Sequence, residues 1–447
     1  MTNSDLPIEP QSEPVSETAI VQVTSMPTAI QRAAQQSHTV LIVHASVGSG
    51  HRSAAKSIAE AFGFLLAEHA ECVPSDLDVR VIDILDYGRH KFDGDKTASM
   101  FVGATRPFYD LTWRYTFTGR ILWGGGTIWS RLMFSPFTEY VEQVKPMAII
   151  ATHITGANAA VSARMLTGQE FPIICVPTDY ETEGLWPHRC ADLFCVATES
   201  MAETLRARRI PEERIRITGI PTREAFRRSY DQLTTRGAFD LPIDKRIVLI
   251  LAGAYLPRPY VRLRETVDKV LPYFHALTDF EFVIVAGGDE EYLASLTRRC
   301  KELDLPNVRP VGYVTEMAAL MSASDLIVCK AGGLTVTECL CAEVPMLLVG
   351  KAYGQEKINV EMLTGLGAAM RVTTARELLS ALRYVMHHPQ SIDAMLVNGR
   401  ILRKPDAARN VASAAMEQVS KPQDLTSPLR KKSFFRLGWG DKPAHVR

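Results

Sequence analysis

The chain has 447 residues, and its 50 Lys and Arg are balanced by 50 Asp and Glu. Because no net charge draws it to nucleic acid, contact with a polyanion or a membrane must be local. The length is sufficient for two α/β domains with a core each. No apolar run reaches the roughly 18 residues that cross a bilayer. The eight cysteines include no CxxC pair, which favours buried thiols in a reducing cytosol over a disulfide or zinc framework.

The first 37 residues are rich in Pro, Ser, Thr, Gln and Glu and hold little to bury, so we expect a disordered leader. The fold is predicted to begin with a strand at 38–43. A glycine-rich stretch follows at 45–53, and apolar residues at helical spacing from Ala54 onwards predict a helix. The glycine turn alone is a weak sign of a dinucleotide site, because no third glycine follows at the expected spacing.

His51 stands in the first turn of this predicted helix. The helix dipole disfavours the charged imidazolium there, which leaves a neutral ring able to accept a proton. The alternative is a histidine that is satisfied by nearby backbone and takes no part in chemistry. Asp76 and Asp78 form a DxD pair ahead of a predicted strand at 79–86 rather than behind it, so we interpret them as a solvated turn and not as metal ligands.

The stretch 101–137 interleaves arginines with large aromatic rings and contains one acidic residue, Asp110. Three of the five tryptophans fall here: Trp113, Trp123 and Trp129. Half-buried rings and guanidinium groups suit the headgroup zone of a bilayer, so the pattern favours lipid contact. A helical hairpin packed on the rest of the domain is the alternative. Base stacking on RNA is disfavoured, because the chain has no basic surplus.

Predicted strands at 147–153 and 173–180 end in polar residues, His153 and Asp179. In a parallel sheet both ends lie at the same edge as His51. They are therefore candidates to orient an acceptor or to assist His51.

Strands are predicted again at 247–254, 282–288 and 308–314, and strands that alternate with helices favour two doubly wound sheets. The apolar run 325–329 predicts a buried strand that ends at Lys330. The pair Gly332-Gly333 follows, and Thr335-x-x-Glu338 has the pattern of a capping box at a helix start. A strand, a glycine turn and a helix N-terminus point unpaired N–H groups and a positive dipole end at one spot, which suits a phosphate.

Pro345 is predicted to end that helix, and 346–349 resumes as a buried strand. The segment 350–359 then collects amide, carboxylate and ammonium groups, which predicts a polar loop. Loops at the carboxyl ends of adjacent parallel strands meet in the ligand crevice, so phosphate and polyhydroxyl contacts could share one cleft.

The region from 377 to about 419 is predicted to be helical, with breaks at Pro389 and Pro405. The tail at 429–439 gathers cations and large rings. This composition suits an anionic membrane surface, or equally an unstructured end.

The strings 331–338 and 354–359 resemble a known nucleotide-sugar site, and Gly-x-Gly-His-Arg at 48–52 resembles the acceptor-side signature of one branch of the same family. They are similar to the glycosyltransferases that include monogalactosyldiacylglycerol synthase, diacylglycerol glucosyltransferase and the enzyme of the peptidoglycan lipid precursor, glycosyltransferase family 28. The resemblance covers roughly 38–410. It implies an α/β protein of GT-B architecture, with two doubly wound Rossmann-like domains facing across a cleft.

The resemblance sets the expected domains as a leader at 1–37, an N-terminal acceptor and membrane-binding domain at 38–228, a C-terminal UDP-sugar-binding domain at 240–404, a helix at 405–420 and a basic-aromatic tail at 421–447. It gives the base role to His51, with Asp179 beside it. The glycine turn would hold the diphosphate, Glu338 the ribose, and Gln355 with Glu356 the sugar. The donor site so implied comprises Gly253, Tyr313, Val314, Gly332, Gly333, Leu334, Thr335, Glu338, Gln355 and Glu356. On the acceptor and membrane side are Gly48, Gly50, Trp113, Trp123 and Trp129.

Many relatives have a longer glycine-rich loop at the end of the stretch 247–254, whereas this chain continues as Tyr255-Leu256-Pro257, which puts the contribution of Gly253 in question. Arg258 is a candidate to replace the lost dipoles with a charge.

The implied activity is transfer of a hexose, with inversion, from UDP-glucose or UDP-galactose to diacylglycerol, with no metal or other cofactor and no nucleic acid. The implied location is the inner face of the cell membrane, as a cytoplasmic peripheral protein on an anionic surface. Two alternatives remain open: a UDP-sugar epimerase of the same architecture, and a non-catalytic membrane-associated sensor of UDP-sugars.

Overall fold

The computed structural model describes residues 37–47, 49–68, 71, 73–89, 130–182, 186–253, 260–350 and 355–421. The predicted leader, the tail from 422 onwards and most of the aromatic-basic stretch, including its three tryptophans, lie outside these ranges. None of the helices in these ranges combines the length and the apolar character that a bilayer crossing needs.

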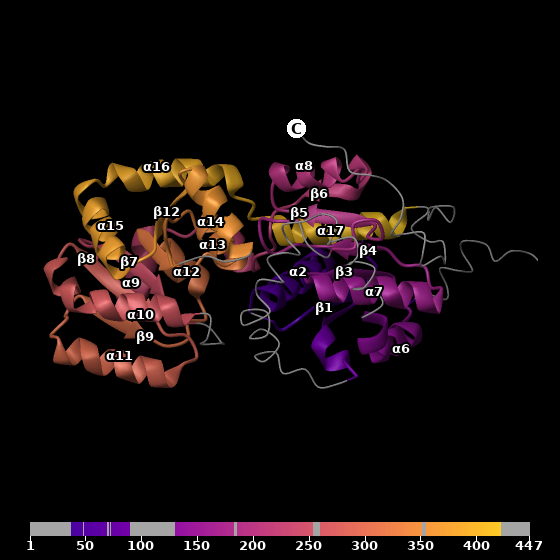
Figure 1. The fold of residues 1–447 in the computed structure, drawn as a ribbon, viewed down its shortest axis with the longest axis horizontal. Helices are drawn as coiled ribbons and strands as arrows, with labels where there is room; N and C mark the ends of the chain where they lie inside the picture. The colour runs from indigo at the N-terminus through magenta and orange to yellow at the C-terminus, as the bar shows by residue number, and fades with distance from the viewer. Residues whose placement is uncertain are drawn as a thin grey trace, which may run out of the picture. The chain divides into compact units, whose positions relative to one another are not determined.

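The first sheet has six parallel strands in the order β2-β1-β3-β4-β5-β6 (Figure 1). The strands are β1 (Thr39–His44), β2 (Asp78–Asp83), β3 (Ala148–Ala151), β4 (Ile173–Cys175), β5 (Leu193–Val196) and β6 (Ile215–Ile217). The helices are α2 (Ser49–Ala67), α6 (Ser135–Val144), α7 (Ile154–Thr167) and α8 (Glu199–Ala207), with short 3-10 turns η1 (Ile84–Tyr87) and η2 (Glu212–Arg214).

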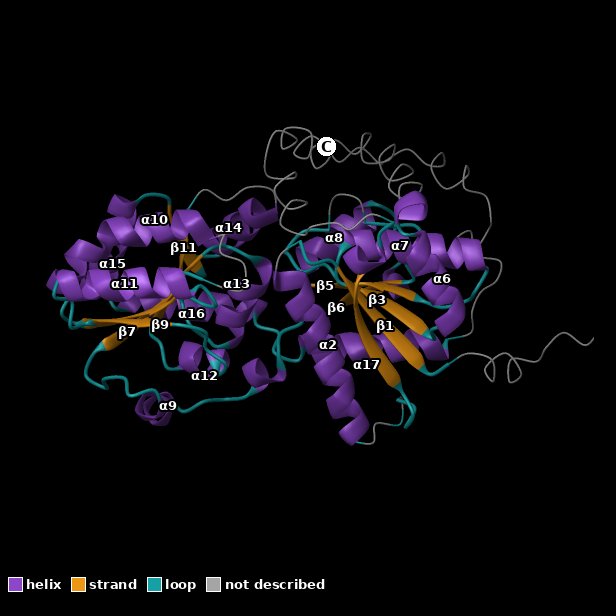
Figure 2. Cartoon of the chain, turned by 90° about the horizontal axis from the view of Figure 1, so that it is seen from below, coloured by secondary structure: helices purple, strands orange, loops and turns teal. Residues whose placement is uncertain are grey.

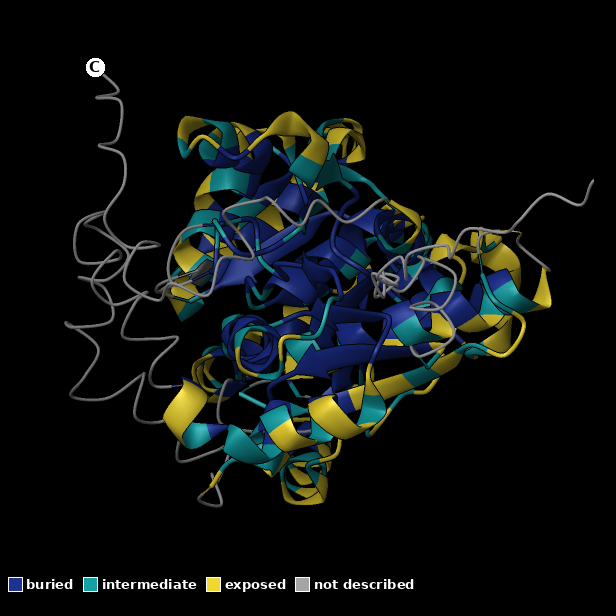
Figure 3. Cartoon of the chain, turned by 90° about the vertical axis from the view of Figure 1, so that its right-hand side faces the viewer, coloured by how far each residue is buried: buried dark blue, intermediate teal, exposed yellow. Residues whose placement is uncertain are grey.

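Both faces of this sheet are covered, and β1 shows why. Its residues are buried without alternation, as expected for a parallel strand between two helix layers. Val40 and Ile42 belong to the cluster that contains α2, whereas Leu41 and Val43 belong to the cluster that contains α6 and α7. Figure 3 shows the inner strands in the buried colour, whereas the edge strand β2 and the outer helix faces are largely exposed. The sheet is therefore held firmly, and its carboxyl edge is a rigid place for a site.

The second sheet has the order β12-β11-β10-β7-β8-β9, again with all pairings parallel. Figure 2 shows its orange strands among purple helices. Its strands are β7 (Arg246–Leu251), β8 (Phe280–Val285), β9 (Val308–Val311), β10 (Leu326–Cys329), β11 (Met346–Val349) and β12 (Ala369–Val372). Its helices are α9 (Gln232–Ala238), α10 (Val261–Val270), α11 (Glu290–Glu302), α12 (Met317–Ser322), α13 (Gly333–Cys341), α14 (Gln355–Gly365), α15 (Ala375–His387) and α16 (Gln390–Gly399). The 3-10 turns are η3 (Glu224–Arg227), η5 (Leu271–Ala276) and η6 (Arg400–Leu402). The prediction of two doubly wound sheets is confirmed.

The last helix, α17 (Ala407–Ser420), packs against the first sheet rather than the second. In Figure 1 the yellow α17 lies among the indigo and magenta elements, and its residues Val411 and Ala412 are fully buried in the cluster of α2. The chain therefore crosses from the first sheet to the second after β6 and returns to the first sheet just before α17. These two passages touch at Gly219, where a Cβ would lie 2.5 Å from the Lys404 Cβ and where φ is +93°, so only glycine fits.

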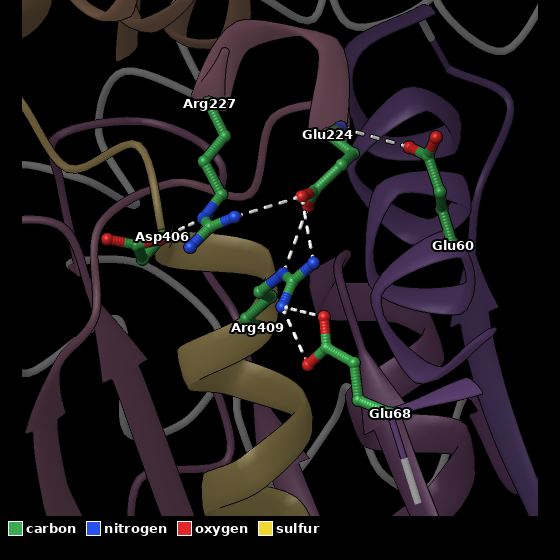
Figure 4. A network of polar contacts seen from close by, with 6 residues as sticks. All are labelled: Glu60, Glu68, Glu224, Arg227, Asp406 and Arg409. Atoms are coloured by element: carbon green, nitrogen blue, oxygen red, sulfur yellow. Dashed lines mark hydrogen bonds and ion pairs between the residues drawn. The ribbon is translucent and has the colours of Figure 1, made fainter. Parts of the chain in front are cut away.

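Charged residues tie both passages to α2 (Figure 4). Arg409 in α17 donates to Glu224 at 2.9 Å and to Glu68 at 2.8 Å, and its guanidinium lies 5.2 Å from the ring centroid of Phe64 in α2. The Glu224 backbone N–H donates to Glu60 of α2 at 3.1 Å. The helix whose first turn holds the base candidate His51 is thus anchored to both passages at Glu60 and Phe64 in its second half and at Glu68 just after its end.

Two local predictions are wrong. The helix α13 begins at Gly333 with Gly332 as its N-cap, and no side chain caps it, so Thr335 and Glu338 lie inside the helix and form no capping box. Gln355 and Glu356 lie in the first turn of α14 and not in a loop. In both places the helix begins earlier than the polar residues suggested. Glu and Gln are good helix formers, and Thr335 is carried into α13 because the helix already starts at Gly333.

Candidate active site

His51 is the third residue of α2, at the carboxyl edge of the first sheet. Its Nδ1 lies 3.0 Å from the Thr152 carbonyl oxygen and 2.8 Å from Thr178 Oγ1. A carbonyl oxygen can only accept, so Nδ1 carries the proton. The other ring nitrogen, Nε2, then keeps a lone pair. The ring is fixed in the tautomer that a general base requires.

Burial lowers the pKa of His51, while the Asp179 carboxylate and the hydrogen bond to Thr152 oppose that shift. The net direction is downward, so the ring is neutral at neutral pH. The sequence led to the same protonation state through the helix dipole, but burial is the leading cause in the structure.

His153 lies beside His51, with ring centroids 4.6 Å apart in an edge-to-face contact. It is the N-cap of α7, and its Nδ1 accepts a hydrogen bond from the Thr155 N–H at 3.1 Å. Burial lowers the pKa of His153 well below its usual value. Its Nδ1 lone pair is therefore engaged, and its Nε2 carries the proton. In this state His153 packs against the base candidate and has no free lone pair with which to take its proton.

The glycine turn of the second sheet adjoins this cluster. A Cβ on Gly333 would lie 2.1 Å from the Thr178 carbonyl oxygen and 2.6 Å from Asp179 Oδ1, so no larger residue fits without displacement. A Cβ on Gly50 would lie 3.8 Å from the Leu334 Cβ. The two glycine turns, one from each sheet, therefore meet at one place. The α13 N-terminus, which has no side-chain cap, begins at this meeting point.

Lys330 is a residue for which the sequence suggested no role. Its Nζ donates to Glu356 Oε1 at 2.7 Å and lies 2.7 Å from where a Cβ on Gly332 would be. Burial lowers the pKa of Lys330, but the Glu356 carboxylate and other neighbours raise it more, so the ammonium stays charged. A cation thus stands at the turn expected to hold a diphosphate. The signal available in the sequence was a lysine between a buried strand and a glycine turn.

Glu338 lies in the middle of α13 and is partly buried. Burial raises the pKa of Glu338 to about 7, and the charge of Arg223 opposes this shift. Near neutral pH the carboxyl group therefore changes between a protonated form, which donates a hydrogen bond, and a charged form, which only accepts. Its contacts with hydroxyl groups would then depend on pH.

Three other predicted donor residues lie in loops at the carboxyl ends of strands in the second sheet. Gly253 follows β7, and a Cβ there would lie 1.8 Å from the Ala286 carbonyl oxygen, so the position accepts only glycine. Tyr313 and Val314 follow β9; Tyr313 is 72% exposed, and Val314 packs at the edge of the core. Gly48, Trp113, Trp123, Trp129 and Arg258 lie outside the described residues, as does the side chain of Gln355.

The DxD aspartates have other partners. Asp76 lies 2.6 Å from His38, and Asp78 accepts from Arg80 at 2.7 Å. Among the described residues no group of three or more His, Cys, Asp or Glu is arranged to hold a metal ion. That the reaction needs no metal remains a prediction.

Two family models match the chain. The model described as monogalactosyldiacylglycerol (MGDG) synthase matches residues 51–222, and the glycosyltransferase family 28 C-terminal domain matches residues 248–411. The processive diacylglycerol beta-glucosyltransferase of Bacillus subtilis (strain 168) is 24% identical over 403 residues, which cover 88% of this chain and 97% of the relative. The protein of the same name from Staphylococcus saprophyticus subsp. saprophyticus is 23% identical over 413 residues, which cover 92% and 98%.

Solved structures share the fold at low identity. MurG of Acinetobacter baumannii has a TM-score of 0.52 at 18% identity, and the likeness covers 84% of this chain and 98% of that one. The UDP-GlcNAc 2-epimerase from Neisseria meningitidis bound to UDP-GlcNAc has a TM-score of 0.53 at 15% identity, covering 85% and 100%. These likenesses confirm the predicted GT-B fold with two Rossmann-like domains. Since the family models together extend from His51 to the last helix, the chain belongs to glycosyltransferase family 28, in the group of monogalactosyldiacylglycerol synthases and processive diacylglycerol glucosyltransferases.

Proposed function

We propose that this protein transfers a hexose, glucose or galactose, from a UDP-sugar to the free hydroxyl of diacylglycerol, with inversion at the anomeric carbon. The observation that carries the proposal is the meeting of the two glycine turns. It brings a histidine with an unprotonated Nε2 close to a helix N-terminus without a side-chain cap and to the ammonium of Lys330. A base and an anion site side by side are what a direct displacement requires.

In the proposed step, His51 Nε2 takes the proton of the acceptor hydroxyl as the oxygen bonds to the anomeric carbon. The bond between that carbon and the β-phosphate oxygen breaks on the opposite face, and its electron pair leaves with UDP. The proton ends on His51, and the negative charge ends on the diphosphate. Stabilising the departing diphosphate is therefore the main electrostatic task of the second half of the site.

Two features supply that stabilisation. The first turn of α13 offers backbone N–H groups and the positive end of the helix dipole. Lys330 adds a full positive charge beside Gly332. Together they take the part that a divalent cation plays at other diphosphate sites, so the proposal requires no metal. Glu338 would accept from ribose hydroxyls, and Gln355 and Glu356 would contact the hexose.

On the acceptor side, the aromatic-basic stretch 101–137 and the tail 421–447 would contact anionic lipid. On this proposal the protein is peripheral at the cytoplasmic face of the cell membrane, where diacylglycerol is presented within the bilayer. The names of the curated relatives support diacylglycerol as the acceptor.

The test is an assay of the purified full chain with UDP-glucose or UDP-galactose and diacylglycerol in anionic liposomes. The expected result is a glycolipid with the β-linkage and one molecule of UDP released for each sugar transferred. Conversion of the UDP-sugar to an epimer would show the epimerase alternative instead. UDP-sugar binding without any product would show the sensor, and either result would overturn the transferase proposal.

A further inference from the structure

Asn359 is fully buried in α14, one helical turn after Gln355 and Glu356. Its Nδ2 donates to Asp179 Oδ1 at 2.9 Å and to the Ala331 carbonyl oxygen at 2.9 Å. Its Oδ1 accepts from the Tyr180 N–H at 3.1 Å. The amide orientation is determined by these partners, because a backbone N–H can only donate and a carbonyl can only accept.

The partners of Asn359 belong to both sheets. Asp179 and Tyr180 follow β4, whereas Ala331 follows β10 and directly precedes the glycine turn. One side-chain amide thus connects the turn expected to hold the diphosphate with the segment that contacts the base. A buried polar group of this kind is costly when its partners are removed, so the connection is rigid while it is complete.

The same segment reaches His51 in two ways. Thr178 Oγ1 lies 2.8 Å from His51 Nδ1, and the Asp179 carboxylate is the neighbouring charge that raises the pKa of His51. The other titratable groups near His51 are His44 at the end of β1 and His153 before α7, with Arg52 adjacent on α2. Of these groups, Asp179 is the one that Asn359 holds.

We infer that Asn359 is a positioning residue that couples the donor site to the base: it holds Asp179 against the diphosphate turn and so fixes where His51 stands relative to the bound donor. This inference rests on the proposed function. It assigns a mechanistic part to a residue that touches neither substrate. An Asn359 that serves only to stabilise the fold would have no effect on the titration of His51.

Tyr180, the residue after Asp179, provides a matched control for the Asn359 hydrogen bonds. The Tyr180 hydroxyl makes a 2.9 Å hydrogen bond to Thr337 Oγ1, which also joins the β4 segment to α13 in the buried interior. Tyr180→Phe removes that bond and leaves the Asp179 side chain and its partner in place. Comparison with Asn359 variants therefore separates loss of a buried hydrogen bond from loss of this particular link.

The first measurement is an NMR titration of His51 in the full-length wild type, Asn359→Ala and Tyr180→Phe, so it needs no transferase activity. Asn359→Ala removes the donor that holds the Asp179 carboxylate without adding or removing a charge, so the carboxylate can move away from His51 and the pKa of His51 should fall by about half a unit or more. Tyr180→Phe should leave the pKa of His51 unchanged. If Asn359→Ala does not fold, Asn359→Ser takes its place, with the same expected fall. An unchanged His51 pKa in the folded variant would overturn the inference.

The second measurement is steady-state kinetics with UDP-glucose and diacylglycerol liposomes. Asn359→Ala should lower kcat by roughly 10- to 100-fold with little change in KM for the donor, because it loosens the geometry of the reacting groups rather than the donor contacts. Equal losses in Asn359→Ala and Tyr180→Phe would reduce Asn359 to a structural residue. Failure of the wild type to make glycolipid would count against the proposed function alone, because the His51 titration still reports on the link.

Discussion

His51 and Thr152 are 101 residues apart in the chain and hold each other by two hydrogen bonds. His51 Nδ1 donates to the Thr152 carbonyl oxygen at 3.0 Å, and Thr152 Oγ1 donates to the His51 carbonyl oxygen at 3.0 Å. Thr152 is fully buried at the end of β3. The first turn of α2 is therefore locked to the central part of the sheet, and His51 Nε2 keeps its lone pair.

Replacing His51 with alanine should abolish most of the transfer while UDP binding survives. Loss of a general base costs roughly 100- to 10,000-fold in rate. On the proposed function the UDP contacts lie on the second sheet and do not involve this side chain. Initial rates of glycolipid formation and calorimetric titration with UDP would measure the two effects. Lost UDP affinity with undiminished turnover per bound donor would refute the base assignment.

Glu338 should make donor affinity depend on pH. Burial raises the pKa of Glu338 to about 7, so its carboxylate, which on the proposed function accepts from ribose hydroxyls, forms as the pH rises through neutrality. The affinity for UDP-glucose should therefore increase from pH 6 to pH 8, and Glu338→Gln should remove that increase. UDP-glucose is the suitable probe, because it has no terminal phosphate that titrates near pH 6. Pyrophosphate affinity at pH 8 should be the same in both proteins, and an equal loss for both ligands would contradict ribose recognition.

The carboxyl group of Glu338 should make the protein less stable as the pH rises. The pKa of Glu338 is raised in the folded protein. At a pH between the ordinary glutamate pKa and about 7, Glu338 is therefore protonated in the folded state and deprotonated in the unfolded state. The free energy of unfolding should fall as pH rises through that window, by about 1–3 kcal/mol from this residue. Urea unfolding of the wild type and Glu338→Gln at pH 5 and pH 8 would measure it. A difference between the two proteins that does not change with pH would argue against the raised pKa.

Lys330 should matter for catalysis as a charge. Lys330→Met removes the cation beside Gly332 and should lower kcat by roughly 100- to 1,000-fold, as loss of a stabilising group at a developing negative charge does. Lys330→Arg should restore part of the rate. Lys357 is a matched control, because its side chain is 63% exposed and pairs with Glu361 on the surface of α14. Lys357→Met with the same loss as Lys330→Met would show that the effect is general and not tied to the diphosphate turn.

The meeting of the two glycine turns can be tested by adding a single methyl group. Gly333→Ala would place a Cβ 2.1 Å from the Thr178 carbonyl oxygen, so the segment must move, at a cost of about 1–3 kcal/mol. Gly50→Ala would place one 3.8 Å from the Leu334 Cβ, an ordinary contact, and should keep the melting temperature within a few degrees of the wild type. Thermal unfolding of both variants is the measurement. Equal melting temperatures would mean that the turns are farther apart in solution.

Arg409 should contribute more to stability than its neighbour Arg227. Arg409 and Glu224 are 17% and 11% exposed, so removing the arginine leaves a nearly buried carboxylate and should cost about 1–3 kcal/mol. Arg227 and Asp406 are 44% and 51% exposed, so Arg227→Ala should cost less than about 1 kcal/mol. Urea unfolding of Arg409→Met and Arg227→Ala compares them. Similar costs would show that the network of Figure 4 is solvated rather than buried.

Local pattern was enough to recognise much of this site. His51 after a strand and Gly332-Gly333 before a helix are each readable from neighbouring residues, because strand, turn and helix start are encoded within about ten positions. The same local reading misplaced the start of α14 and expected a capping box at Thr335. Polar side chains at those positions are compatible with either a loop or a helix, and only packing against the sheet decides between them.

The sequence did not indicate which residues far apart in the chain contact one another. Asn359 was visible only as part of a motif, and its bonds to Asp179 and Ala331 join positions that are 180 and 28 residues away. Lys330 stood next to the glycine turn, but its pairing with Glu356 depends on how β10 and α14 approach. The return of α17 to the first sheet likewise leaves no local mark, since an apolar helix face can cover any sheet.

By itself the amino-acid sequence determined the two parallel sheets, the pair of glycine turns and the family, because hydrophobic periodicity and short motifs act over a few residues. Only the tertiary structure decided that the turns meet, which nitrogen of His51 carries its proton, and that one buried amide holds the donor turn to Asp179. Those facts depend on distances between residues far apart in the chain, which are set by how the strands and helices pack.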